Sequence, residues 1–244
     1  LLAGSYKMKA SWRIGLFKNN QNLELIVGAA AAINKSLDIR LDLLDKLENS
    51  NNFLHDLAMT AYTKATIEGT LSYFTNAMND LNYATGIMNE LVKEEEGWAP
   101  DLGYCLADQV LYGIGANAEN GLPPPLDEAE KCLYYFNNTL SDFITNNKMI
   151  RIKYFEFLGE AAIPAAYGSR RTDISISFIE SGLRQIETIM RSNKYITKKE
   201  LAIDTLSFFK IPVNVLEDLF KRGLNKKRYE ELFQELISEI LIQR

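Results

Sequence analysis

Few side chains in this sequence are of the types that usually carry out catalysis. His55 is the only histidine among the 244 residues. A zinc site with two histidines is therefore excluded, and any Ser–His or Cys–His nucleophile pair would have to use His55 itself. His55 falls at the start of a predicted helix, where we expect a solvated or helix-capping role. The sequence predicts no catalytic residue and no metal site, and we do not expect an enzyme.

One glycine-rich segment resembles a nucleotide-binding motif but lacks its context. Gly113, Gly115 and Ala118 match the dinucleotide pattern G-x-G-x-x-G/A. That pattern binds a pyrophosphate only where a helix begins at once, so that the helix N-terminus receives the phosphates. Here three prolines follow at 123–125, so we expect a loop and no cofactor. The net charge of −5 also argues against nucleic-acid binding, which needs a basic face.

Two further pairs of side chains could do chemistry. Arg170 and Arg171 follow a glycine and could bind a carboxylate or phosphate, although a solvated loop pair is the simpler interpretation. Cys105 and Cys132 could join in an oxidising compartment if their Cα atoms are close, or could be two small buried apolar residues.

The first five residues suggest a location outside the cytoplasm. Leu1-Leu2-Ala3-Gly4 has the form that precedes the lipidated cysteine of bacterial lipoproteins, but Ser5 stands where that cysteine is expected. A serine hydroxyl cannot form the thioether. We expect residues 1–5 to be a signal remnant with no role in the fold, and Ser5 to mark the anchor position of a native cysteine. A chance match is the alternative.

The elements that must position these residues are all predicted to be helices. Apolar residues recur at steps of three and four almost throughout, and no segment alternates with the period of a strand. The clearest stripe predicts one long helix over 67–92. Helices are also predicted over 23–33 and 37–47, on either side of Asn34-Lys35-Ser36, and Asn49 to Asn52 are predicted to form a turn that caps the next helix. Thr197 and Glu200 form a capping box that predicts another start.

The whole pattern predicts an all-α protein of about ten helices in stacked antiparallel hairpins. Without a fixed repeat length, any repeats are degenerate, so we expect a tetratricopeptide (TPR)-like superhelical array. Residues 6–244 are predicted to form a single domain, with a sub-boundary in the loop 113–126. The last helix, with Leu236, Ile240 and Leu241, could be buried within the chain or serve as a contact surface.

Two segments resemble a known family. Residues 155–168 (FEFLGEAAIPAAYG) and 177–183 (SFIESGL) look like the T-component lipoproteins of tripartite ATP-independent periplasmic (TRAP) transporters. In that family a helix ending in F-L-G is followed by a proline, a glycine-containing loop and another helix. A weaker similarity covers parts of residues 23–63. Tyr154 departs from the family, which often has a histidine near this position.

The resemblance implies a function. It implies a periplasmic, lipid-anchored scaffold of TPR-like hairpins that oligomerises and engages the transporter's substrate-binding protein, with an apolar ligand as a further expectation. Membrane contact would then come only through the N-terminal lipid. Tyr154, Phe155, Arg170 and Arg171 are the candidate binding residues. The alternatives are a helical peptide-binding adaptor, for which a cytoplasmic location is open, and a helical enzyme with a carboxylate-based site in a closed pocket.

Overall fold

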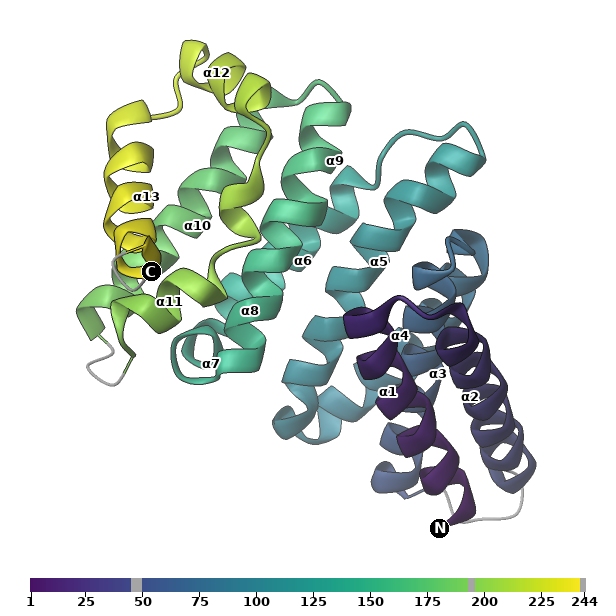
Figure 1. Ribbon diagram of the computed structural model, residues 1–244. Coiled ribbons are helices and arrows are strands. Elements are labelled where there is room, and N and C mark those ends of the chain that lie inside the picture. The colour runs from purple at the N-terminus through teal and green to yellow at the C-terminus, as the bar shows by residue number, and fades with distance from the viewer. Residues whose placement is uncertain (45–49, 193–195, 242–244) are drawn as a thin grey trace. The chain divides into compact units, whose positions relative to one another are not determined.

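The computed structural model describes residues 1–44, 50–192 and 196–241, and the regular elements of that part of the chain are all helical (Figure 1). The all-α prediction is therefore confirmed. The described residues contain helices α1 to α13. None of the described helices combines the length and the hydropathy needed to span a membrane.

The chain forms two compact units rather than the single domain that we expected. The N-terminal unit is Leu1–Ala116 and the C-terminal unit is Asn117–Arg244. The division falls inside the predicted sub-boundary 113–126. Each unit has its own buried core.

Helical hairpins build the N-terminal unit. Its elements are α1 (Leu2–Asn20), α2 (Leu23–Leu44), α3 (Asn51–Thr70), α4 (Phe74–Glu94), the short 3₁₀ turn η1 (Glu96–Trp98) and α5 (Ala99–Glu119), which runs into the next unit. Turns of two or three residues join α1 to α2 and α3 to α4, so each pair is antiparallel. Gln21 and Ser72 allow these turns by taking left-handed backbone conformations, with φ of 50° and 62°.

Three boundary predictions in this unit are wrong. Helix α2 continues through residues 34–36, because Ser36 is fully buried and its hydroxyl donates to the Ala3 carbonyl at 2.8 Å. The predicted helix over 67–92 breaks at residues 71–73. The predicted loop from 113 is helical as far as Glu119, since Gly115 serves close packing rather than a turn: a Cβ there would lie 2.5 Å from the Phe74 ring.

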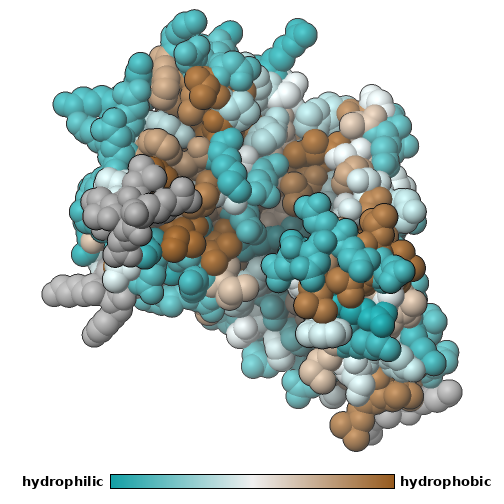
Figure 2. Space-filling view, viewed as in Figure 1, coloured by the Kyte–Doolittle hydropathy of each residue, from teal (hydrophilic) through white to brown (hydrophobic). Residues whose placement is uncertain are grey.

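The first residues belong to the fold, contrary to our expectation. Leu2 begins α1, and Ala3 is 7% exposed and accepts the hydrogen bond from Ser36. Figure 2 shows apolar surface at the N-terminal end of α1, where Leu1 and Leu2 are exposed. In the predicted capping turn at 49–52, Ser50 is the cap, because its hydroxyl accepts a hydrogen bond from the Phe53 amide. Asn49 of this turn, and Leu47 at the end of the predicted helix 37–47, lie outside the described residues.

The C-terminal unit is built around one long bent helix. Its elements are α6 (Leu126–Asn138), α7 (Ser141–Asn146), α8 (Lys148–Glu156), the π-helical segment η2 (Phe157–Ala162), α9 (Ile163–Gly168), α10 (Thr172–Ser192), α11 (Lys198–Asp204), the 3₁₀ turn η3 (Phe208–Lys210), α12 (Val213–Lys221) and α13 (Lys226–Leu241). Segments α8, η2 and α9 run on without a break. The capping box of Thr197 and Glu200 is confirmed at the start of α11.

A series of aromatic contacts forms the core of this unit. Neighbouring rings in the series lie 5.1–5.7 Å apart, a spacing that favours edge-on packing. The series consists of Phe136, Tyr154, Phe155, Phe208, Phe209 and Tyr229. Leu236 of α13 is fully buried within the unit, whereas the side chains of Ile240 and Leu241 lie outside the described residues.

Candidate functional site

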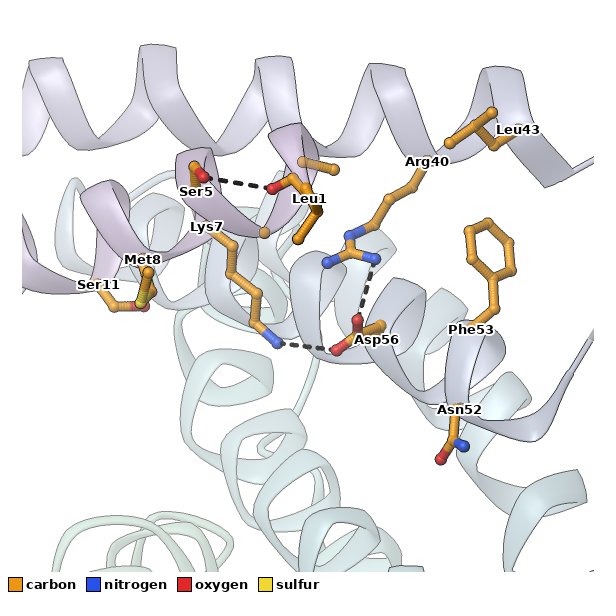
Figure 3. A pocket seen from close by; sticks show the side chains of 12 residues that line it. Leu1, Ser5, Lys7, Met8, Ser11, Arg40, Leu43, Asn52, Phe53 and Asp56 are labelled. Atoms are coloured by element: carbon orange, nitrogen blue, oxygen red, sulfur yellow. Dashed lines mark hydrogen bonds and ion pairs between the residues drawn. The ribbon is translucent and has the colours of Figure 1, made fainter.

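An open groove lies in the N-terminal unit, among α1, the end of α2 and the start of α3 (Figure 3). We call it the α1–α3 groove. Its volume is about 780 Å³, which lies within the range of small-molecule sites. It is lined by Leu1, Ala3, Gly4, Ser5, Lys7, Met8, Ser11, Arg40, Leu43, Asn52, Phe53 and Asp56.

Helical periodicity explains why these residues meet. Leu1, Ser5, Met8 and Ser11 follow steps of three and four, so they share one face of α1. Arg40 and Leu43 are three residues apart at the end of α2. Asn52, Phe53 and Asp56 belong to the first two turns of α3, whose start is fixed by the Ser50 cap.

Three charged side chains form the polar centre of the groove. Lys7 Nζ lies 3.9 Å from Asp56 Oδ1, and Arg40 Nη1 lies 3.3 Å from Asp56 Oδ2. Figure 3 shows the two cations reaching the same carboxylate from α1 and α2. Among the lining side chains that the structure describes, there is therefore one more positive charge than negative.

Arg40 and Lys7 are both largely buried, and they share one negatively charged partner in the groove. The Arg40 side chain is 7% exposed, and its buried Nε has no hydrogen-bond partner among the described residues. Burial lowers the pKa of Lys7, and the attraction of Asp56 offsets this only in part, since Arg40 lowers the pKa further. The groove is thus a place where an additional negative charge would be stabilised.

The walls beside this centre are apolar. Leu43 of α2 and Phe53 of α3 both line the groove (Figure 3). On the side of α1, Met8 is 73% exposed and Leu1 is fully exposed. The groove thus combines a charged centre with apolar surface that water can reach.

Ser5, the predicted anchor position, lines this groove. Its side chain is exposed, and its hydroxyl donates to the Leu1 carbonyl at 3.3 Å. This contact is the ordinary one between a helical serine and the carbonyl four residues earlier.

The other predicted binding residues do not form one site. Tyr154 and Phe155 are fully buried in the C-terminal unit. The Tyr154 hydroxyl lies 3.1 Å from Ser181 Oγ and donates to Asn137 Oδ1 at 3.3 Å, and burial raises the pKa of Tyr154. Both aromatic residues therefore hold the core together and present no surface to a partner.

Arg170 and Arg171 lie at the other end of the same bent helix, in the turn before α10. Tyr154 lies in α8, whereas Arg170 lies two residues beyond the end of α9, so the helical segments η2 and α9 separate the two side chains. Both arginines are exposed, and Arg171 forms a two-point contact with Asp173 at 2.9 and 3.1 Å. They match the simpler interpretation, a solvated loop pair.

His55 is held more firmly than a solvated or capping residue would be. Its ring stacks on Trp98 with 4.0 Å between the centroids, and its Nε2 lies 2.8 Å from Asp101 Oδ2. The side chain is 19% exposed. The sequence did not reveal this contact, because Trp98 and Asp101 are more than 40 residues away along the chain.

A cluster that the sequence analysis missed joins α3 to α4. Lys64 Nζ lies 2.6 Å from Asp80 Oδ2 and 3.3 Å from Glu68 Oε1. Burial, together with the hydrogen bond and negative charge of Asp80, raises the pKa of Glu68 to about 7. Only the spacing of Lys64 and Glu68, four residues apart, was visible as a signal.

The residues of the groove were also missed, although one signal was present. Buried positions of α2 include Ile26, Ala29, Ile33, Ser36 and Arg40, a stripe with steps of three and four. An arginine on an apolar stripe must find a polar partner inside the protein. Lys7 and Asp56 offer no comparable sequence signal, because they come from other helices.

No group of three or more His, Cys, Asp or Glu side chains in the described part of the chain could hold a metal ion. Comparison with known protein families and with curated proteins finds no match to this chain.

Proposed function

We propose that this protein is a helical scaffold that binds other molecules through the α1–α3 groove. In its specific form the proposal is an extracytoplasmic accessory of a TRAP-type solute transporter, which binds the transporter's periplasmic substrate-binding protein. The observation that carries the binding role is the open groove, with apolar walls around Lys7, Arg40 and Asp56. The transporter link rests on the resemblance of residues 155–168 and 177–183. TPR-like packing of the hairpins and self-association are parts of the same proposal.

The groove favours binding over the enzyme alternative. A carboxylate-based active site would need at least two acidic groups in a closed pocket, whereas the groove contains one carboxylate and is open. The pair Glu68 and Asp80 is the one observation in favour of an enzyme, because a carboxyl with a pKa of about 7 can act as an acid or a base. Lys64 bridges that pair in the α3–α4 hairpin, and structural ion clusters shift pKa values in the same way.

Two observations bear on lipid anchoring, in opposite directions. The side chain at position 5 is exposed, as a lipidated residue must be. Anchoring there would also remove residues 1–4, so the groove would lose Leu1, Ala3 and Gly4 from its lining, and Ser36 would lose its buried acceptor, the Ala3 carbonyl. Such a loss costs about 1–3 kcal/mol. The mass of the intact protein from its natural source decides between a chain that starts with a lipidated cysteine at position 5 and a chain that retains Ala3.

Co-purification tests the partner. The full chain is tagged at its C-terminus and mixed with purified substrate-binding proteins encoded beside its gene. A complex that survives size-exclusion chromatography, and that Met8→Glu weakens at least tenfold, would support the proposal. Val27→Glu is the matched control, because Val27 is a similarly exposed apolar residue of the neighbouring helix α2 and does not line the groove.

The outcomes separate the alternatives. If no substrate-binding protein forms a complex, the transporter role is wrong. Equal weakening by Met8→Glu and Val27→Glu would remove the groove from the interaction. If instead unstructured peptides bind and Met8→Glu abolishes that binding, the protein is a peptide-binding adaptor.

A further inference from the structure

We propose that the α1–α3 groove binds a small amphipathic monocarboxylate, with its carboxylate at Lys7 and Arg40 and its apolar chain along Leu43 and Phe53. This inference rests on the proposed function, because it names the ligand class of the same groove. It follows from the charge, the burial and the shape of the site.

The charge of the groove calls for one additional anion. Lys7 and Arg40 share the carboxylate of Asp56, and Asp101 also attracts Lys7, but the lining side chains that the structure describes carry one positive charge in excess. A monoanion balances that charge, whereas a dianion such as phosphate would exceed it. Asp56 is 52% exposed, so solvent weakens its hold on both cations.

The hydrogen-bonding capacity of Arg40 gives the ligand a defined place. Its buried Nε is a donor without a partner among the described residues, and an unsatisfied buried donor is costly. A carboxylate can accept from two nitrogens of one guanidinium at once. An incoming carboxylate would therefore form ion pairs with the guanidinium of Arg40 and with the ammonium of Lys7.

The apolar walls select for the rest of the ligand. Leu43 and Phe53 line the groove, and Met8 borders it from α1 (Figure 3). Each methylene that leaves water against such surface contributes about 0.8 kcal/mol. An unbranched chain of several carbons therefore adds affinity that a short carboxylate such as acetate lacks.

Isothermal titration calorimetry of the full chain tests the proposal with decanoate as the probe. Decanoate is expected to bind at least tenfold more tightly than either decanol, which lacks the charge, or acetate, which lacks the chain. Comparable binding of decanol and decanoate would overturn the proposal, because the charged centre would then have no role. Failure of decanoate to bind would overturn it as well.

Matched variants locate the site. Lys7→Gln keeps the pair of Arg40 and Asp56, and is expected to weaken decanoate binding at least fivefold while decanol binding is unchanged. Lys9→Gln removes an exposed lysine of the same helix and should leave both unchanged. Equal effects of Lys7→Gln and Lys9→Gln would show that decanoate responds only to overall charge, which contradicts the proposal.

A peptide C-terminus could supply the same carboxylate. A hexapeptide that ends in Leu is therefore titrated as the free acid and as the amide. Tight binding of the acid alone, without decanoate binding, would assign the groove to peptide ends and overturn the small-molecule proposal. Complex formation with a substrate-binding protein is measured separately, so either proposal can fail while the other stands.

Discussion

At the scale of single residues, the informative side chains are charges placed where water is scarce. Arg40 lies on the buried stripe of α2, and Glu68 lies against a second carboxylate in the α3–α4 hairpin. A buried charge is tolerated only with partners, so its surroundings show which interactions the fold must maintain. Lys64 links both carboxylates of the hairpin cluster, but in each cluster one buried atom, Arg40 Nε or Glu68 Oε2, has no hydrogen-bond partner among the described residues.

The raised pKa of Glu68 predicts a pH-dependent loss of stability. Its pKa is about 7 in the folded protein and 4.5 for an unperturbed glutamate, so the folded state holds this proton more tightly than the unfolded chain does. The resulting stabilisation is complete below about pH 4.5 and is lost as the pH rises to about 7. Glu68→Gln removes this titration. When the pH rises from 5 to 8, the free energy of unfolding of the variant should therefore increase by about 2 kcal/mol relative to that of the wild type.

Urea unfolding at both pH values measures this difference. Glu90→Gln serves as the control for loss of one surface charge, since Glu90 is a 73% exposed carboxylate of α4. If the difference in free energy of unfolding between Glu68→Gln and the wild type is the same at pH 5 and pH 8, the pKa of Glu68 is not raised.

At the scale of the elements, close approach of the backbone explains the glycines that the sequence presented as a family motif. Gly159 lies in η2, and a Cβ there would be 2.3 Å from the Ser207 carbonyl oxygen. Gly182 of α10 likewise leaves room for the Phe208 ring. The two glycines of the segments that resemble the T-component proteins thus allow residues 207 and 208 to pack closely against η2 and α10.

Alanine substitutions of two helical glycines are therefore expected to act in opposite directions. Gly159→Ala should destabilise the protein by about 1–3 kcal/mol, since the backbone of residue 207 must move. Gly86→Ala in α4 meets no atom within 4 Å and should stabilise the helix by about 0.5–1 kcal/mol. Thermal and urea unfolding measure both. Equal effects would mean that Gly159 is not a site of close packing.

A buried ion pair fixes α8 against α11. Arg151 Nε donates to Asp204 Oδ2 at 2.8 Å, and the two side chains are 4% and 0% exposed. Arg151→Met alone should cost about 3–5 kcal/mol, because buried Asp204 would lose its close partner and keep Lys148 at 4.0 Å. Adding Asp204→Leu should restore most of the loss. In a double-mutant cycle measured by urea unfolding, additive effects of the two substitutions would contradict this coupling.

How far the sequence predicted these elements depended on whether the signal was local. The Ser50 and Thr197 caps lie within a few residues of their partners, and these were predicted correctly. The break expected at residues 34–36 was wrong because burial of Ser36 against Ala3 depends on a contact 33 residues away. The groove was missed for the same reason, since its charged centre comes from three separate helices.

At the scale of the whole molecule, the division at residues 116 and 117 determines how unfolding should be observed. Both tryptophans, Trp12 and Trp98, belong to the N-terminal unit. Tryptophan fluorescence therefore reports on that unit, whereas far-UV circular dichroism reports on the helices of both. The sequence indicated the boundary only through the proline-rich residues 123–125, because Gly115 serves helix packing.

Each unit has its own core, and a compact unit of this kind can unfold on its own. Gly159→Ala should therefore lower the urea midpoint of that part of the circular dichroism signal that comes from the C-terminal unit. The midpoint measured by tryptophan fluorescence should stay within error of the wild-type value. The dichroism curve should become biphasic, because the C-terminal unit melts before the unit that contains Trp12 and Trp98. Gly86→Ala is the control, since it should raise the fluorescence midpoint. If Gly159→Ala shifts both signals equally, the two units unfold together and the division is only geometric.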